Sequence, residues 1–500
     1  MTKPEHFGWQ GWALIVMLML LSFCSTIYKY SEPNHPYWDE KFHVTSAQKY
    51  LNNHHFMQAH PPLGKMLIAL GEIIVDANPP ETDARFVDIL LIGKHGPDFN
   101  MRGYRLIPMI LAWLLTPITF IIFFLILRNR ILAALLSFVI IFDTGQISLL
   151  KAAVLESPLI FSTAFAILAF LVIPKYVKNK WKFALWTFLL GTAMGAAFVT
   201  KLTGLFLILL APLLLLHLWP NWKKWLIAFA FIFAGFAIVT VGIWQLHFSL
   251  GTNINPTLPM EGYHTNLHEY REILDQGKNP SLLMFPTILA DSFKYMYRSH
   301  TNIGDLNLCT PDYGGSPWIF WPFGGKSIHF LSGRSKGGLG NYMYLQANPA
   351  VWWTATLSVF ISIAMLLGFI FMGQKLRKPK LLISFLILYL GYMLAISQIS
   401  RTMFLYHYFP PLYVSFILLA LVINELKARG PFKGEVISLL CILLSSLMVL
   451  GYLIYRPMID LTPMTDEQLK RRAFFPLWNV RCHNCKQDNL YYKEKWCNPS

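Results

Sequence analysis

Two adjacent carboxylates lie in a polar segment that directly follows an apolar run. The segment reads "SEPNHPYWDEKFHVTSAQKYLNNHHFMQAHPPLGK" (31–65), with Asp39-Glu40 near its start and His60 and Lys65 at its end. A carboxylate at a membrane surface, with its pKa raised by partial burial, can act as a general base toward a hydroxyl group. An Asp-Glu pair in a loop is more often plain solvated surface, but the accompanying histidines and prolines favour a site.

The box "HPPLGK" restrains the backbone near these carboxylates. Pro61 and Pro62 fix their own φ angles and hold the residues before them in extended forms. Gly64 is expected to permit an abrupt turn. The stretch "LGKMLIALGEIIV" (63–75) is too short to cross a bilayer comfortably, and it predicts a helix that lies in the membrane interface.

Four charged residues interrupt the apolar runs: Asp143, Lys151, Glu156 and Lys201. Charges are costly inside a bilayer, so they indicate a functional site by default. They could instead lie at the ends of spans or pair only for structure. Both interpretations stay open for Lys151 and Glu156.

Further cations lie near the ends of apolar runs. Arg102 and Arg105 open one run, and Arg401 and His407 belong to the short loop "ISRTMFLYHYFPP". A guanidinium group binds phosphate through two parallel hydrogen bonds. This group of residues is therefore suited to a phosphate carried by a lipid.

The composition indicates a membrane protein. Of 500 residues, 55% are hydrophobic and 14% are charged, whereas a soluble domain has about 25% charged residues. Many runs approach the roughly 20 apolar residues that cross a bilayer, and they are apolar all round rather than alternating, unlike the strands of a barrel. We predict an all-α polytopic membrane protein with about eleven spans. The predicted spans are 12–28, 104–127, 131–150, 152–173, 184–200, 202–219, 225–247, 351–372, 381–398, 409–426 and 435–455.

The net charge of +16 is interpreted as a sign of how the chain is oriented in the membrane, and not of nucleic-acid binding. Lys and Arg cluster in short loops between alternate spans, which the positive-inside rule places in the cytoplasm together with the N-terminus. The polar regions 30–101 and 247–350, the 401–407 loop and the tail 456–500 then face outward. Part of the excess positive charge would also suit anionic headgroups or a phosphate-bearing substrate.

The cysteines predict a structural rather than a catalytic role. Cys24 and Cys441 lie in apolar runs and are expected to pack there. The others are Cys309, Cys482, Cys485 and Cys497. The three in the tail could ligate zinc together with His483, but an oxidising compartment favours a disulfide between two of them. The third would be left over or pair with Cys309.

Six segments, in the same order along the chain, resemble the motifs of the protein O-mannosyltransferase family. They are "DE" followed by "HPPLGK", "KAAVLES" (151–157), "TKLTGLF" (200–206), "SPWIFWP" (316–322), "ANPAVWW" (347–353) and "RTMFLYHYFPPL" (401–412). The resemblance implies a GT-C-type glycosyltransferase with large extracytoplasmic loops. Members of that family transfer a sugar, typically mannose, from a polyprenyl phosphate to a hydroxyl, typically of Ser or Thr in an exported protein, with inversion at the anomeric carbon.

The resemblance also suggests roles for individual residues. Asp39 resembles the family's catalytic carboxylate, and Glu40 is its neighbour in the motif. The substrate-binding candidates, several of them for the lipid phosphate, are His60, Lys65, Arg102, Arg105, Lys151, Glu156, Lys201, Arg401 and His407.

Three departures from the family pattern leave the acceptor open. Gln58 stands where the family often has an Asp, the order Lys41-Phe42-His43 differs from the eukaryotic pattern, and the outer loop is too short for the MIR domain of eukaryotic members. These features suggest a bacterial-type relative in the inner membrane, with a transmembrane domain at 1–455. The acceptor could be an exported protein or a glycolipid or cell-envelope glycan.

A transporter or flippase for a lipid-linked substrate is a second class of hypothesis. Intramembrane charges would suit it, but the chain shows no paired repeats of the kind common in transporters. The chain has no phosphate-binding loop of the Walker type. No cofactor is expected with certainty, and a divalent cation is considered.

The charge pattern predicts a cytoplasmic N-terminus and an outward-facing tail. Reporter fusions after Lys182, Lys224 and Lys378 should read as cytoplasmic, because these lysines lie in the basic loops. A fusion after Tyr491 should read as outside. A cytoplasmic reading at Tyr491 would contradict this topology.

Overall fold

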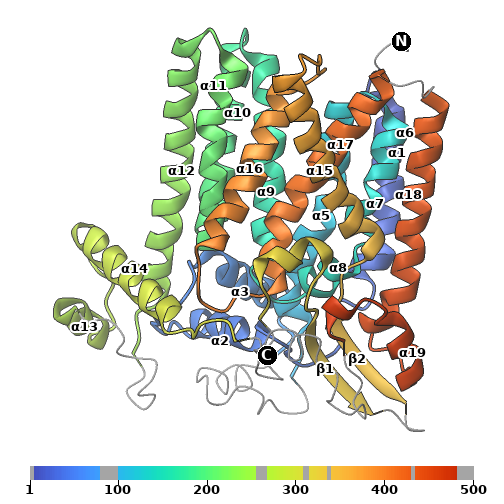
Figure 1. The fold of residues 1–500 in the computed structure, drawn as a ribbon. Coiled ribbons are helices and arrows are strands. Elements are labelled where there is room, and N and C mark those ends of the chain that lie inside the picture. The colour runs from blue at the N-terminus through green and yellow to red at the C-terminus, as the bar shows by residue number, and fades with distance from the viewer. Residues whose placement is uncertain are drawn as a thin grey trace, which may run out of the picture.

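Helices form most of the protein, and they run side by side in one bundle (Figure 1). The computed structural model describes residues 5–78, 99–254, 267–307, 315–334, 339–429 and 434–480. The helices of the bundle are α1 (Gly8–Ser22), α5 (Arg102–Leu127), α6 (Arg130–Leu136), α7 (Phe138–Ile141), α8 (Thr144–Leu150), α9 (Glu156–Val172), α10 (Lys180–Phe198), α11 (Leu210–Leu218), α12 (Trp222–Leu250), α15 (Pro349–Phe371), α16 (Pro379–Ser397), α17 (Phe409–Arg429) and α18 (Gly434–Tyr455).

The polytopic membrane fold predicted from composition is confirmed. Within the described residues, eight helices are long and apolar enough to cross a membrane, or nine if the bent pair formed by α6–α7 and α8 is one span. The predicted spans 184–200 and 202–219 correspond to α10 and to the shorter apolar stretch Leu202–Leu218. These two segments run beside α12 (Figure 1) but are not among the eight.

The helices differ in how deeply they are buried. Over the 18-residue apolar window of each segment, 94% of the residues are buried in Leu405–Lys427, which contains most of α17, and 83% in Glu156–Tyr176, but only 17% in Trp222–Leu250. Helices α9 and α17 are therefore the centre of the bundle. Helix α12 presents most of its apolar surface outward, as expected of a helix that faces lipid.

The bend between α7 and α8 accounts for one of the charges inside the apolar runs. Asp143 accepts hydrogen bonds from the backbone N–H of Gly145 (3.2 Å), from the side-chain amide of Gln146 (2.9 Å) and from the indole of Trp352 (2.9 Å). The carboxylate thus satisfies backbone and side-chain donors at the break, which is a structural use of a buried charge.

The polar segments gather at one end of the bundle, away from the N-terminus (Figure 1). They comprise α2 (Glu40–Leu51), α3 (Leu63–Val75), α13 (His268–Asp275), α14 (Phe285–Thr301), the strands β1 (Ile328–Arg334) and β2 (Gly340–Leu345), and α19 (Asp466–Arg472). The predicted helix 63–75 is confirmed as α3.

The two strands form an antiparallel hairpin with a bulge that serves the site. The pairing runs from Ile328 opposite Leu345 to Arg334 opposite Gly340, and it shifts between His329 and Leu331. Phe330 is the extra residue, and its ring centre lies 5.3 Å from that of Tyr37 and 5.7 Å from that of Trp38. A bulge re-aims a side chain, and here it directs Phe330 onto the loop that carries Asp39.

The predictions for the polar cysteines fall on Cys309, Cys482, Cys485 and Cys497, which lie outside the described residues. Cys441 is buried, as expected for a packing residue, but the expected packing of Cys24 is wrong, because Cys24 lies on an exposed face of its helical segment.

Helices α3 and α5 cross with their backbones in contact. A Cβ atom added at Gly103 would overlap the carboxyl group and the backbone of Glu72, and one added at Gly71 would overlap the carbonyl oxygen of Gly103. Only glycine permits this close approach. The contact packs α3, which belongs to the polar end of the bundle, against α5.

We predict that Gly103→Ala destabilises the protein by about 1–3 kcal/mol, since the overlap forces the two helices apart. Gly242→Ala is the matched control, because a Cβ there meets nothing within 4 Å. The control should leave stability unchanged or raise it by up to about 1 kcal/mol. The midpoint of thermal unfolding in detergent measures both, and equal midpoints for the two variants would contradict the prediction.

Candidate active site

Asp39 lies at the start of α2 without acting as its cap. It occupies the residue before Glu40, yet its side chain makes no capping hydrogen bond. Instead its Oδ2 accepts a hydrogen bond of 3.0 Å from the hydroxyl of Tyr406, which precedes α17. Two segments far apart in the sequence thereby meet at one carboxylate.

The surroundings of Asp39 raise its pKa to about 6. Burial is the largest cause because it disfavours the charged carboxylate, and the neighbouring Glu156 carboxylate adds to the rise. The Lys201 ammonium and the Tyr406 hydrogen bond oppose it. A carboxyl group with such a pKa is mostly ionised at neutral pH and is still basic enough to accept a proton.

Lys201 and Glu156 form a buried ion pair beside Asp39. Lys201 Nζ lies 2.6 Å from Glu156 Oε1, and it also lies over the ring of Tyr406 at 4.8 Å from the ring centre. Tyr406 thus contacts Asp39 through its hydroxyl and Lys201 through its ring. The carboxylate of Asp39 and the ammonium group of Lys201 therefore contact the same aromatic residue.

The "HPPLGK" box docks onto the ends of two central helices. The backbone N–H of Leu63 donates to the carbonyl of Val199 (2.9 Å), just after α10. Gly64 is the second residue of α3, and a Cβ there would press on Leu155 and Thr200. The expected abrupt turn at Gly64 is therefore wrong, because this glycine is needed for close packing inside a helix.

This docking brings His60 and Lys65 to the site. Lys65 is buried, and its pKa is lowered to about 7 by burial and by the nearby Lys49 ammonium. Burial, Lys201 and Lys65 hold the pKa of His60 well below its usual value. Both residues have other cations rather than acids as their charged neighbours.

Glu40 and Arg105 form a second buried ion pair, here called the clamp. Arg105 Nε and Nη2 donate to the two Glu40 carboxylate oxygens at 2.6 and 2.7 Å. The backbone N–H groups of Tyr37 (3.0 Å) and Ala153 (2.7 Å) donate to the same carboxylate. Glu40 is therefore fully engaged by groups that order the loop.

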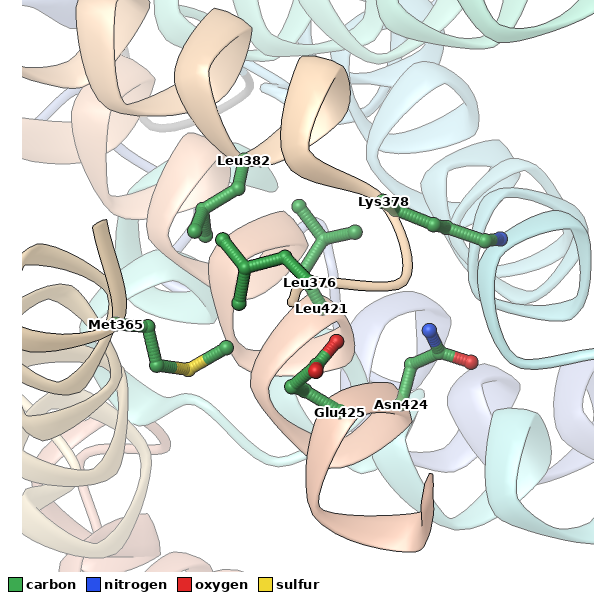
Figure 2. A pocket seen from close by; sticks show the side chains of 7 residues that line it. All are labelled: Met365, Leu376, Lys378, Leu382, Leu421, Asn424 and Glu425. Carbon is green, nitrogen blue, oxygen red and sulfur yellow. The ribbon is translucent and has the colours of Figure 1, made fainter. Parts of the chain in front are cut away.

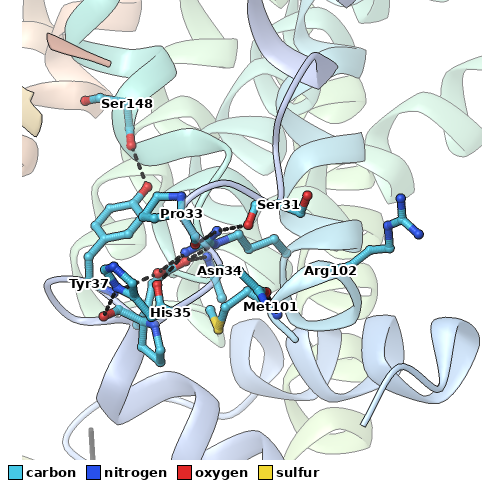
Figure 3. Close-up of polar contacts among 12 residues, drawn as sticks. Ser31, Pro33, Asn34, His35, Tyr37, Met101, Arg102 and Ser148 are labelled. Atoms are coloured by element: carbon cyan, nitrogen blue, oxygen red, sulfur yellow. Dashed lines mark hydrogen bonds and ion pairs between the residues drawn. The ribbon is translucent and has the colours of Figure 1, made fainter. Parts of the chain in front are cut away.

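The remaining donors of Arg105 bind the loop before Asp39. They reach the carbonyl oxygens of Ser31 (2.8 Å), Pro33 (2.8 Å) and His35 (3.1 Å). Figure 3 shows these carbonyls converging, with Arg102 extending away from them. A guanidinium group has five N–H donors, and all five are used here. Arg105 thus has no donor left for a phosphate.

Two further cations differ in their neighbours. Lys151 lies 3.8 Å from Asp460 and is coupled to the clamp, and burial lowers its pKa to about 8. Among the described residues, Arg401 donates one hydrogen bond, to the Thr402 carbonyl, and it lies close enough to lower the pKa of His300. Arg401 therefore keeps donors for a ligand, while Lys151 binds the region after α18.

His407 supports Tyr406 rather than facing Asp39. Its ring stacks on that of Tyr406 (4.6 Å between centres), and Trp321 stacks at 6.2 Å. The sequence did not single out Tyr406 or His300. Tyr406 lies within the motif "RTMFLYHYFPPL" (401–412), in which the candidates were chosen for their charge and not for a hydroxyl donor. Nothing in the sequence around His300 marks it.

One pocket of the structure lies apart from this site. A small pocket between α15, α16 and α17 (Figure 2) contains none of the candidate residues. Its lining residues are Met365, Leu376, Lys378, Leu382, Leu421, Asn424 and Glu425. In the part of the chain that the structure describes, no group of three or more His, Cys, Asp or Glu residues is arranged to hold a metal ion.

Two family models match the chain. Residues 16–253 match "Dolichyl-phosphate-mannose-protein mannosyltransferase", and residues 291–478 match "C-terminal four TMM region of protein-O-mannosyltransferase".

Curated relatives match part of their own length. The protein O-mannosyl-transferase 2 of Drosophila melanogaster is 28% identical over 219 residues, which are 42% of this chain and 28% of the relative. That of Danio rerio is 27% identical over 326 residues, which are 62% of this chain and 40% of the relative. The matched part of the chain spans less than half of the length of either relative.

The solved structures show a likeness in fold. The Saccharomyces cerevisiae protein O-mannosyltransferase Pmt1-Pmt2 complex bound to the sugar donor matches with a TM-score of 0.80 at 15% identity, over 96% of this chain and 94% of that chain. The archaeal oligosaccharyltransferase AglB from Archaeoglobus fulgidus matches with a TM-score of 0.50 at 12% identity, over 91% and 56%.

We predict that Arg105→Lys destabilises the protein by about 3–5 kcal/mol, because lysine cannot replace five fixed donors and leaves buried carbonyls and a carboxylate unsatisfied. Glu40→Gln should have an effect of similar size. Arg102→Lys, at an exposed position in the same helix turn, is the control. Thermal unfolding in detergent is the measurement, and a wild-type midpoint for Arg105→Lys would remove the clamp from its structural role.

Proposed function

Because the chain belongs to the protein O-mannosyltransferase family, we propose that it transfers a hexose, mannose first of all, from a polyprenyl-phosphate carrier to a hydroxyl group of Ser or Thr in exported proteins. The architecture is that of GT-C-type glycosyltransferases, as the sequence predicted. Family members and relatives named for dolichyl-phosphate-mannose support the donor class. We place the protein in a bacterial inner membrane with the site facing outward.

Asp39 is the observation that carries the proposal. A partly buried carboxylate with a pKa near 6 lies at the polar end of a membrane bundle, next to the buried Lys201. Asp39 would accept the proton of the acceptor hydroxyl while the oxygen of that hydroxyl attacks the anomeric carbon. A new bond forms between that carbon and the acceptor oxygen, and the bond to the phosphate oxygen breaks. Attack opposite to the leaving phosphate inverts the anomeric configuration.

The leaving phosphate needs cations, and Lys201 and Arg401 are the candidates proposed for this role. Lys201 is paired with Glu156, and Arg401 keeps most of its donors. The phosphate takes the electron pair of the broken bond and becomes more negative, so cations that are already in place stabilise the transition state more than the ground state. Lys201 is also close to Asp39 through Tyr406, which fits a sugar lying between the base and the phosphate.

The clamp has a positioning role in this proposal. Glu40 follows Asp39 directly and is held by four donors, so it fixes the backbone that carries the base. Glu40 would then act through Asp39 and would not touch the substrate.

The acceptor is tested with purified protein in detergent and polyprenyl-phosphate-mannose. Peptides from exported proteins and membrane glycolipids are offered separately, and mass spectrometry identifies the mannosylated product. Modification of peptides at Ser or Thr supports the proposal. Modification of glycolipids alone would show that the acceptor is a glycolipid and not a protein. Transport of the donor without sugar transfer would show that the protein is a transporter and not a transferase.

We predict that Asp39→Asn lowers turnover by about 10²–10⁴-fold, the usual contribution of a general base. Asn caps a helix about as well as Asp, so a merely structural Asp39 would leave turnover almost unchanged in the folded variant. Binding of the donor should persist, because the cations are intact.

The pH dependence follows from the same carboxyl group. Its raised pKa means that the active carboxylate prevails above about pH 6 and is lost below it, so kcat/KM should fall as pH decreases through about 6. Tyr406→Phe removes a hydrogen bond that lowers this pKa, and should shift the acid limb to higher pH. An unchanged acid limb in Tyr406→Phe would contradict the assignment.

A further inference from the structure

Several buried ring nitrogens have no hydrogen-bond partner among the residues that the structure describes. They include Trp38 Nε1, His43 Nδ1, His60 Nδ1 and His300 Nδ1. Leaving a buried polar atom unpaired costs roughly 1–3 kcal/mol, so each such atom in a native protein requires an explanation. Three of them belong to neighbouring histidines, which indicates a site that a polar ligand completes.

The three histidines come from three separate elements, and His43 and His300 both lie near His60. His43 lies one helical turn after Asp39 on α2, so both side chains lie on the same face of that helix. His60 precedes α3, and its ring centre lies 5.2 Å from that of His300 near the end of α14. His300 also hydrogen-bonds the backbone of Ala59. We call these three residues the imidazole cluster.

The cluster is uncharged at neutral pH. Burial is the largest cause of the lowered pKa of each of the three histidines, and the charge of Lys201 adds to the lowering in every case. A neutral imidazole both donates and accepts hydrogen bonds, and a sugar hydroxyl does the same. Phosphate instead favours charged donors, which Lys201 and Arg401 supply.

The position of the cluster fits the group that is attached to the phosphate. All three histidines are electrostatic neighbours of Lys201, while His43 shares a helix with Asp39. A hexose between the phosphate cations and the base would therefore lie against the cluster. A metal ion is a poorer occupant, because the described residues include no His, Cys, Asp or Glu group arranged to hold one.

We propose that His43, His60 and His300 recognise the hydroxyl groups of the transferred hexose, and that His300 is a specificity-determining residue contributed by the large outer loop. The inference rests on the proposed function, since it requires a lipid-linked sugar as donor. The ligand class is a neutral hexose attached to a phosphate.

The test compares two probes that differ only in the sugar. Polyprenyl-phosphate-mannose and polyprenyl phosphate of the same chain length are titrated into the full-length protein in nanodiscs. The variants are His300→Leu, which removes the hydrogen-bonding groups, and His300→Gln, which restores an amide. Tyr297→Leu is the matched control on the same helix, because Tyr297 is 72% exposed. Thermal unfolding midpoints establish that each variant is folded. If His300→Leu does not fold, His60→Gln is the second variant to be titrated.

The expected result is a loss confined to the mannosyl probe. His300→Leu should bind it at least about 10-fold more weakly, as expected when one or two hydrogen bonds in a buried site are lost. His300→Gln should recover part of that affinity, while binding of polyprenyl phosphate and both titrations of Tyr297→Leu should match wild type. With substrate present, the same loss should appear in KM for the donor.

Other outcomes overturn the inference in recognisable ways. Equal losses for both probes would mean that His300 acts on the phosphate. No loss for either probe would mean that it does not touch the donor. If wild-type protein itself binds the two probes equally, the proposed donor is rejected, and this failure is distinct because it appears without any substitution.

Discussion

The pairing of Glu40 with Arg105 is the interaction on which the site depends. It joins the loop before α2 to α5, because one guanidinium group binds both a carboxylate and three loop carbonyls. The Ala153 N–H adds the segment before α9 to the same carboxylate. Breaking a buried pair of this kind costs about 3–5 kcal/mol. The clamp thus fixes the residue beside Asp39 relative to the bundle.

Three other contacts bring the rest of the site to that fixed point. The bulge at Phe330 packs the hairpin against Trp38, and the docking of Leu63 on Val199 places the "HPPLGK" box beside the end of α10. Tyr406 then connects the start of α17 to Asp39. Each contact joins segments that are distant in sequence, so the environment that raises the pKa of Asp39 exists only in the folded chain.

Residues of the same type are given different roles by their hydrogen-bonding partners. Asp39 accepts one side-chain hydrogen bond and stays basic, whereas Glu40 is held by four donors. Arg105 uses all its donors on the protein, whereas Arg401 keeps most of its own for a ligand. The number of donors and acceptors already satisfied separates a positioning group from a group that can meet a substrate.

The sequence by itself determined the membrane fold, the helix at 63–75, the family and the segments that contain the site. These features follow from apolar runs, local periodicity and ordered motifs, which are written along the chain. The tertiary structure alone decided that Arg105 is saturated, that Gly64 serves close packing, and that Tyr406 and His300 lie against the site. Saturation and proximity depend on which distant groups meet, and no local pattern of residues encodes that.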